Sequence, residues 1–303
     1  MRLASQILLL SLFFLLAVSQ RSIAAIITGN EITYTVQGHD SLLLISAKLG
    51  VDPETIIREN SLNHSAQIAP GRVLKLNTRK ISPKAIGNGI IIDITGRMLY
   101  FFKAGRLEMS FPVGLGKTAW QGLNRWHTPS GSFTITGKDR NPVWYVPESI
   151  QREMLAENKP MLTTVSPGQG NPLGAYVLYT SLKGIGIHET IWPTTVYQYR
   201  SHGCIRVLRN NIAHLFDAIE LGTAGELVYK PVKIAVADEG RIYLQADPDA
   251  YGKNATAADP LPNVVNQCRK MGVAGKVDWA RVKNVLRART GNAEDITRAS
   301  AKY

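Results

Sequence analysis

Residues 199–207, YRSHGCIRV, place a histidine, a glycine and a cysteine next to one another between two arginines. The chain contains only one other cysteine, Cys268, so Cys204 stands out as a possible nucleophile. A thiol has a pKa of about 8.5 and becomes a useful nucleophile when a nearby base or a positive field favours the thiolate. The chemistry therefore requires a base, and the natural candidate is His188.

His188 ends the short apolar run GIGIH, where a side chain can project from the edge of a rigid strand into a cleft. The segment 189–200 can loop out and return Ser201, His202, Gly203 and Cys204 beside this histidine. A cysteine and a histidine paired in this way support acyl transfer through a thioester.

Two neighbours of Cys204 fit the same chemistry. Gly203 lets the backbone come close to a substrate, so we expect the amides of Gly203 and Cys204 to face a developing oxyanion. Arg206 follows the cysteine by two residues and shares its side in an extended segment. There it can hold a carboxylate, bias the thiol toward its anion, or simply pair with an acidic neighbour.

The residues alone permit three interpretations of Cys204. Free cysteine is among the most buried residue types, so a core thiol is the ordinary expectation. Zinc is the second, since His188, His202 and Cys204 are three potential ligands and a catalytic zinc needs three plus water. His202 and Cys204 are awkwardly spaced for one ion, and neither Cys-x-x-Cys nor His-Glu-x-x-His occurs. We therefore expect no metal and no cofactor, while the buried thiol and the nucleophile both stay open.

The elements that must position these residues are mostly strands. Over 89–236, short apolar runs are separated by hairpin punctuation such as TGR and KAGR. Helices are predicted at 147–157 and 210–220, so this domain is expected to be mainly β with a few helices. A polar extension follows over 237–303, with a predicted helix that carries Val282, Val285 and Leu286. We assign it no function.

A smaller module precedes this domain over 33–77. A strand (ITYTV) leads into a helix that we expect Asp40 to cap and Gly50 to end. A second helix begins with Asp52 as its N-cap and Pro53 at the first helical position, and a final strand closes the module. The pattern predicts a β-α-α-β unit, joined to the next domain by a linker over 78–88.

The N-terminus has the layout of a secretory signal peptide over 1–25. Its apolar stretch, residues 7–18, is short of the ~20 residues that a membrane-spanning helix needs. We expect cleavage after Ala24 or Ala25 and a location in the periplasm or cell envelope. The formal charge of +12 favours an anionic partner, and export favours a carboxylate-rich polymer over nucleic acid. In an oxidising compartment Cys204 and Cys268 could form a disulfide that switches the thiol off.

Several segments in order resemble the L,D-transpeptidase catalytic domain of the YkuD type, a mainly β domain of the β-sandwich type. They are FPVGLGK (111–117), TPSGSFTI (128–135), NPLGAYVLY (171–179) and GIHETIWPTTVYQYRSHGCIRV (186–207). The resemblance implies Cys204 as nucleophile and His188 as base, with a pocket shaped by Ser201, His202, Gly203 and Arg206. This chain has Glu189 where the family often has glycine, and we expect that acid to alter the pKa or substrate contacts of His188.

The same resemblance implies a substrate and a reaction. The thiolate attacks the carbonyl at the L-centre of the third residue of a peptidoglycan stem tetrapeptide, and terminal D-alanine leaves. An amine of another stem then gives a 3-3 cross-link, while a lysine of an envelope lipoprotein, a D-amino acid or water gives other products. Carbapenem β-lactams are implied as inhibitors. The alternatives are an L,D-carboxypeptidase that uses the same site and a wall-binding protein without activity.

The first module resembles the LysM domain, a binder of polysaccharides that contain N-acetylglucosamine. The resemblance rests on YTVQGHDSLLLISAKLGV (34–51), REN (58–60) and APGRVLKL (69–76). It implies that the peptidoglycan glycan is a second binding partner.

Overall fold

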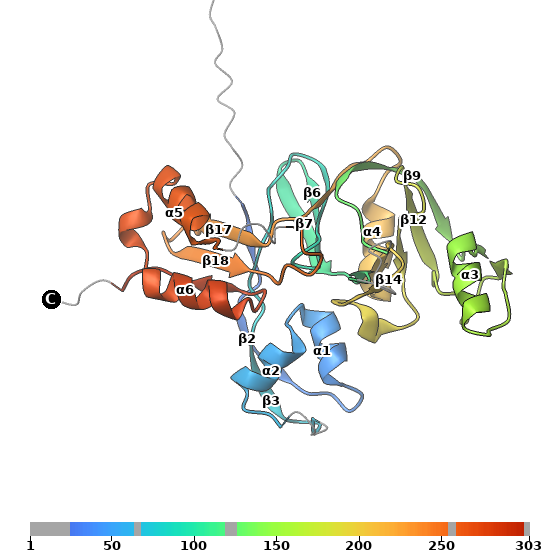
Figure 1. Cartoon of the computed structure of the whole chain (residues 1–303), viewed down its shortest axis with the longest axis horizontal. Helices are drawn as coiled ribbons and strands as arrows, with labels where there is room; N and C mark the ends of the chain where they lie inside the picture. Colours follow the sequence, from blue (N-terminus) through green and yellow to red (C-terminus); the bar gives the residue numbers. More distant parts are fainter. Residues whose placement is uncertain (1–24, 64–67, 119–125, 254–258, 300–303) are drawn as a thin grey trace, which may run out of the picture.

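The computed structural model describes residues 25–63, 68–118, 126–253 and 259–299 (Figure 1). The predicted signal peptide lies outside the described residues, except for Ala25. Three parts follow one another along the chain: an N-terminal module, a central domain and a C-terminal unit. Among the described residues, no helix combines the length and apolar character needed to span a membrane.

The N-terminal module has the predicted β-α-α-β order. Strands β2 (Glu31–Thr35) and β3 (Val73–Asn77) pair antiparallel, with α1 (Leu42–Leu49) and α2 (Pro53–Glu59) between them in sequence. Gly50 ends α1 with a left-handed φ of 68°, as predicted. The side chain of Asp52 caps α2 by accepting a hydrogen bond from the amide of Glu54 at 3.1 Å.

The predicted cap of α1 was wrong by one residue. Ser41 is the N-cap, and its hydroxyl accepts a hydrogen bond from the amide of Leu44 at 3.2 Å. The carboxylate of Asp40 is engaged elsewhere, because it accepts from the Tyr34 hydroxyl at 2.6 Å and from Lys48 Nζ at 2.7 Å. Asp40 therefore ties the helix to the strand that precedes it.

The central domain is built on an eight-stranded mixed sheet, which confirms the predicted mainly β fold. The strand order is β15-β13-β12-β9-β16-β5-β6-β7. Two pairs are parallel, β13 with β15 and β16 with β5, and the remaining neighbours are antiparallel. The bounds are β5 (Gly89–Asp93), β6 (Met98–Lys103), β7 (Arg106–Pro112), β9 (Gly131–Arg140), β12 (Tyr176–Thr180), β13 (Gly186–Glu189), β15 (Ile205–Val207) and β16 (Ala224–Val228).

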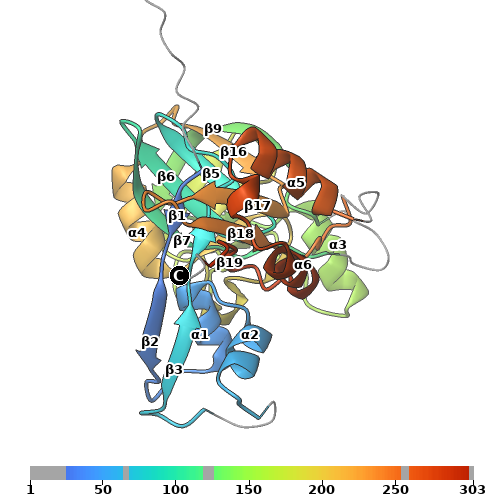
Figure 2. The ribbon, with the colours of Figure 1, turned by 90° about the vertical axis from the view of Figure 1, so that its left-hand side faces the viewer.

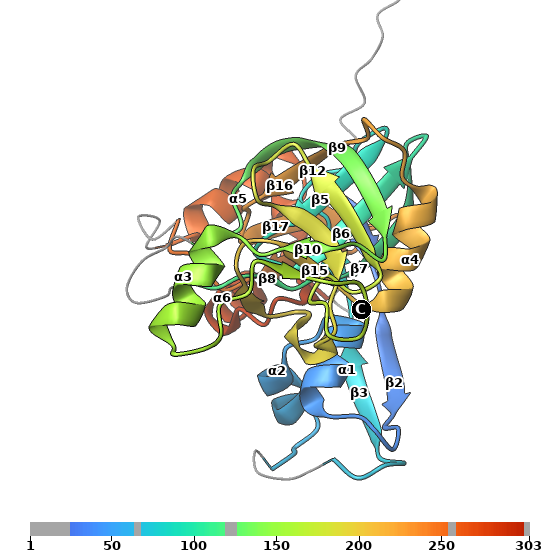
Figure 3. The same cartoon turned by 90° about the vertical axis from the view of Figure 1, so that its right-hand side faces the viewer.

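The predicted hairpins at TGR and KAGR are confirmed as the β5–β6 and β6–β7 connections. Helix α4 (Arg209–Ala218) covers one face of the sheet with Ile212, Leu215 and Phe216 (Figure 3). The opposite face carries a second apolar cluster that includes Tyr100 and Tyr197. Smaller elements surround the sheet: β8 (Leu115–Gly116) paired with β14 (Tyr199–Ser201), β10 (Trp144–Tyr145) paired with β11 (Thr164–Val165), helix α3 (Glu148–Ala156) and the 3-10 helix η1 (Pro193–Thr195).

The C-terminal unit folds around a core of its own. Strands β17 (Val232–Val236), β18 (Ile242–Ala246) and β19 (Ala293–Asp295) form a sheet beside α5 (Leu261–Lys270) and α6 (Trp279–Ala288) (Figure 2). The predicted helix is confirmed as α6, whereas α5 was not predicted. Because β17 and β18 form one hairpin, the predicted boundary between 236 and 237 falls inside it.

The segment predicted as a linker is built into the packing. Its strand β4 (Lys80–Ile81) pairs with β1 (Ile27–Thr28), and Lys80, Ile81 and Ser82 are buried. Its polar composition misled the prediction, because the polar groups find partners inside the protein. The amide of Ile81, for example, donates to Gln245 Oε1 at 2.6 Å.

Candidate active site

Cys204 and His188 come together at the edge of the large sheet. Strands β13 and β15 run parallel, with Ile187 across from Ile205 and His188 across from Arg206. Cys204 directly precedes β15, so it is a diagonal neighbour of His188 on adjacent strands. Both side chains line one cleft of about 510 Å³. The loop between them does return the cysteine beside the histidine, as the sequence suggested.

The cleft is aromatic and cationic. Trp126, Trp144 and Trp192 line it. Among the described lining residues, the side chains with a permanent charge are Lys183 and Arg206. Of the predicted site residues, the cleft is lined by Cys204, His188, Ser201, His202 and Arg206. This environment suits a substrate that carries carboxylates.

His188 is held as a neutral base. Its Nδ1 lies 2.5 Å from the backbone carbonyl oxygen of Glu189, so Nδ1 carries the hydrogen and Nε2 keeps the lone pair. Burial, together with the positive charge of Arg206, lowers the pKa of His188 to about 4, against the opposing effect of the Glu189 carbonyl. The imidazole is therefore uncharged at neutral pH and able to accept a proton.

Cys204 is a partly exposed thiol. The amide of Gly186 donates to its Sγ at 3.4 Å, and the Sγ lies 3.5 Å from the carbonyl oxygen of Gly184. Burial raises the pKa of Cys204, while the Gly186 amide and the charge of Arg206 lower it. The interpretation as a core thiol fits Cys268 instead, which is fully buried in the C-terminal unit. Both cysteines are free, and no disulfide joins them.

Ser201 and Gly203 shape the turn that presents Cys204. The Ser201 hydroxyl donates to the carbonyl oxygen of Cys204 at 2.6 Å and accepts from the amide of Gly203 at 3.1 Å. Gly203 has a φ of 109°, a conformation that other residues rarely adopt. Because its amide is already bonded to Ser201, the expectation that it faces an oxyanion is not met.

His202 is fixed by a partner that the sequence did not reveal. Its Nε2 lies 2.5 Å from Oε2 of Glu153 on α3, and its ring meets the edge of Trp126 at a centroid distance of 4.5 Å. Burial lowers the pKa of His202. Burial by itself would raise the pKa of Glu153, but hydrogen bonds from His202 and Lys117 lower it. No sequence motif surrounds Glu153, so only the position of α3 identifies it.

The zinc interpretation finds no geometry to support it. His202 points toward Glu153, and among the described residues no three His, Cys, Asp or Glu side chains are arranged to hold a metal ion.

Glu189 does not act on His188 through its carboxylate, contrary to expectation. The carboxylate accepts hydrogen bonds from the amide of Ala175 at 2.7 Å and from Arg209 at 3.4 Å. What His188 contacts is the backbone carbonyl of Glu189. The acid therefore braces the neighbouring segment around Gly174.

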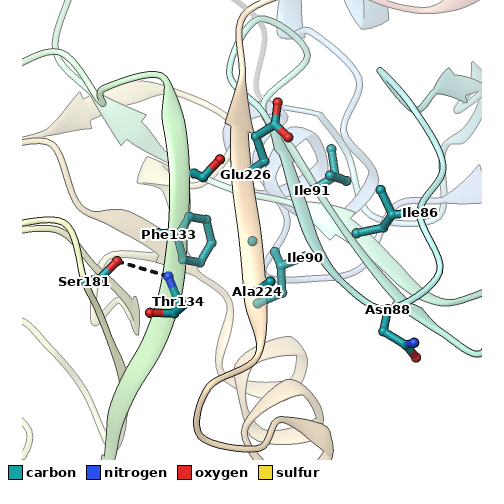
Figure 4. A pocket seen from close by; sticks show the side chains of 11 residues that line it. Ile86, Asn88, Ile90, Ile91, Phe133, Thr134, Ser181, Ala224 and Glu226 are labelled. Carbon is teal, nitrogen blue, oxygen red and sulfur yellow. Dashed lines mark hydrogen bonds between the residues drawn. The ribbon is translucent and has the colours of Figure 1, made fainter.

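A second depression, of about 490 Å³, lies over β5, β9 and β16 (Figure 4). Its lining combines Ser132, Thr134 and Glu226 with Ile90 and Phe133 of the core. Figure 4 shows the amide of Thr134 donating to the Ser181 hydroxyl, at 3.1 Å. Its lining contains neither cysteine nor histidine, so the chemistry resides in the cleft at Cys204.

Comparisons with known proteins match two domains in the chain. Residues 87–234 match the L,D-transpeptidase catalytic domain and residues 34–77 match the LysM domain. The probable L,D-transpeptidase ErfK/SrfK of Salmonella typhimurium is 27% identical over 301 residues, which cover 94% of this chain and 95% of that protein. The putative L,D-transpeptidase YqjB of Bacillus subtilis is 30% identical over 159 residues, which cover 51% of this chain and 73% of that protein.

Among solved structures, an L,D-transpeptidase from Mycobacterium smegmatis aligns with a TM-score of 0.36 and 17% identity, over 69% of this chain and 96% of that one. A TM-score this low gives no support for the fold assignment. The two domain matches and the relatives are sufficient: the chain belongs to the L,D-transpeptidase family and carries a LysM domain.

Proposed function

We propose that this protein is an exported peptidoglycan L,D-transpeptidase in which Cys204 is the nucleophile and His188 the base. The observation that carries the proposal is the placement of His188, on β13, and Cys204, directly before the neighbouring strand β15, at one cationic cleft. Family membership supports peptidoglycan as the substrate, and the LysM domain supports binding to its glycan.

In the first half of the reaction, the Sγ of Cys204 attacks the carbonyl of the third stem residue while Nε2 of His188 accepts the thiol proton. The new C–S bond forms a tetrahedral oxyanion, for which the amide of Cys204 is the proposed donor, because that of Gly203 is engaged. The C–N bond to D-alanine then breaks, the leaving amine takes the proton from His188, and a thioester remains.

In the second half, an acceptor amine attacks the thioester, the C–S bond breaks, and Cys204 leaves as a thiolate while the new amide bond forms. His188 takes the proton from the attacking amine and passes it to the thiolate, which restores the free enzyme. We propose transfer to an amine on another stem or on an envelope lipoprotein. Water at the same step gives the alternative, an L,D-carboxypeptidase.

Arg206 is the proposed anchor for a substrate carboxylate. Its guanidinium stacks 5.5 Å from the ring of Trp192, and within the described chain it forms no ion pair. A cation that lines a cleft without an acidic neighbour can bind an anionic ligand without first breaking an internal contact.

Incubation of the purified protein with tetrapeptide muropeptides tests the proposal. We expect loss of D-alanine and cross-linked dimers, none of either with Cys204→Ala, and unchanged products with the matched control Cys268→Ala. Full activity of Cys204→Ala would falsify the mechanism. Shortened stems without dimers would instead identify the carboxypeptidase.

A carbapenem such as ertapenem gives a second measurement by intact mass. We expect one covalent adduct in the wild-type protein and in Cys268→Ala, and none in Cys204→Ala. Sedimentation with purified sacculi but no adduct would favour the wall-binding protein without activity. Export predicts that the protein recovered from the cell envelope begins after Ala24 or Ala25.

A further inference from the structure

Tyr197 lies in the loop that connects His188 to Ser201, and its backbone is unusual. It is fully buried, yet its φ of 61° falls in the left-handed region that favours glycine. Such a conformation persists only where the surrounding structure holds it in place. Residues outside the loop must therefore hold Tyr197 in this conformation.

The hydroxyl of Tyr197 is held by Lys80. Lys80 Nζ donates to this hydroxyl at 2.8 Å, to the carbonyl oxygen of Gly291 at 2.5 Å and to Asn292 Oδ1 at 2.8 Å. Lys80 is itself 1% exposed and belongs to β4, in the segment between the LysM and catalytic domains. One buried ammonium group thus links the loop to the C-terminal unit.

The backbone and ring of Tyr197 are held by Arg97. Arg97 Nη1 donates to the carbonyl oxygen of Tyr197 at 3.1 Å, and its guanidinium lies 4.0 Å from the centre of the ring. Arg97 follows β5 in the TGR turn. Its Nη2 lies 4.0 Å from the carboxylate oxygen Oδ2 of Asp52 in the LysM domain. A planar guanidinium can stack and donate at once, so it fixes the orientation of the ring.

The LysM domain also contacts this loop. Helix α1 of the LysM domain packs against η1, which precedes Tyr197, and Figure 1 shows α1 beneath this part of the catalytic domain. The amide of Tyr197 donates to the carbonyl oxygen of Val113 at 3.2 Å. All three parts of the chain therefore meet at the loop.

We propose that Tyr197 is a positioning residue, and that Lys80, Arg97 and the C-terminal unit clamp it so that the turn with Cys204 is held beside His188. This inference rests on the proposed function, because it concerns the same cysteine and histidine. It gives the C-terminal extension, to which the sequence assigned no function, a role in the geometry of the active site. A clamp of this kind acts on the chemical step more than on substrate affinity.

Three variants of the full chain test the clamp. Tyr197→Phe removes only the hydroxyl, Lys80→Met removes the ammonium group, and Asn292→Ala removes one of its acceptors in the C-terminal unit. Tyr145→Phe, at an exposed tyrosine of the same domain, is the matched control. The readouts are kcat and KM for D-alanine release, the rate of Cys204 alkylation by iodoacetamide, and the melting temperature.

We expect Tyr197→Phe and Lys80→Met each to lower kcat about tenfold with KM changed less than about twofold. Both substitutions remove the same hydrogen bond between Lys80 and Tyr197. The kcat of the double variant should therefore fall no further than that of the worse single variant. Asn292→Ala should show a smaller loss of the same kind, and Tyr145→Phe none. Folded Tyr197→Phe and Lys80→Met proteins that keep kcat within about twofold, or losses that multiply in the double variant, would overturn the proposal.

Alkylation separates this result from the proposed function, because it needs no peptidoglycan. We expect the alkylation rate of Cys204 in Tyr197→Phe to differ from wild type by about threefold or more at one pH. A wild-type protein without transfer activity would refute the proposed function while leaving this comparison intact. An unchanged alkylation rate in an active enzyme would refute the clamp alone. If Tyr197→Phe does not fold, Asn292→Ala supplies both measurements.

Discussion

The Oε2 atom of Glu153 lies 2.5 Å from Nε2 of His202, and this contact joins helix α3 to the turn that carries Cys204. The same carboxylate also accepts a hydrogen bond from Lys117 at 3.3 Å. Glu153 is the only residue of α3 that is buried. Ser149 and Ile150 of the same helix line the cleft, and the Glu153 carboxylate fixes the His202 ring beside the nucleophile.

Removal of that carboxylate should disturb the site without unfolding the domain. In Glu153→Ala we expect kcat/KM for D-alanine release to fall about tenfold, because His202 loses the partner that orients it. The pKa of His202 should also fall further, since Glu153 raises it in the wild-type protein. NMR titration of the histidines measures that shift. Glu157→Ala, at the end of the same helix, is the control and should leave both quantities unchanged.

The reactivity of Cys204 should depend on pH as expected for a thiol whose pKa is raised by burial. We expect alkylation by iodoacetamide to accelerate about tenfold per pH unit from 7 to 9, without a plateau. In Arg206→Gln the rate at pH 8 should fall about threefold or more, because the charge of Arg206 lowers the pKa of the thiol. Lys183→Gln removes another cation of the cleft and should have a smaller effect. A plateau by pH 7 would instead show a thiolate already paired with an imidazolium.

The stability of the fold should fall in mild acid because of His188. Burial lowers its pKa from 6.5 to about 4, so between these values the unfolded chain binds the proton and the folded chain does not. Stability is therefore lost as the pH falls through this window. From pH 7 to pH 5 the wild-type protein should lose about 2 kcal/mol more than His188→Gln, as measured by urea denaturation. Equal losses in the two proteins would contradict the depressed pKa.

Gly174 should tolerate no side chain, because of Glu189. A Cβ at Gly174 would lie 2.5 Å from the Cβ of Glu189, and the φ of Gly174 is 63°. We expect Gly174→Ala to cost about 2–4 kcal/mol in unfolding free energy. Gly272→Ala is the matched control, since Gly272 has a φ of 69° and open space around it, and it should cost about 1 kcal/mol. In a Glu189→Gly background, the cost of Gly174→Ala should fall to the control value.

Much of the fold could be predicted because it is encoded locally. The hairpins of β5, β6 and β7, the cap of α2 at Asp52 and the end of α1 at Gly50 all follow from short patterns. The helix cap at Ser41 was missed because Asp40, an equally good cap, is bonded to Tyr34 and Lys48. Competition of this kind for one side chain is decided by tertiary neighbours, which a local pattern does not contain.

The sequence by itself determined the family, the mainly β catalytic domain with its LysM module, and the candidate pair of His188 and Cys204. It could do so because motif order and strand periodicity are properties of adjacent residues. Only the tertiary structure decided that Glu153 orients His202, that Gly203 gives its amide to Ser201, and that Lys80 joins Tyr197 to Asn292. The contacts of Glu153 and Lys80 join segments far apart in the chain, and that of Gly203 depends on how one turn is folded. Their hydrogen bonds exist only once packing has brought the donors and acceptors together and excluded water.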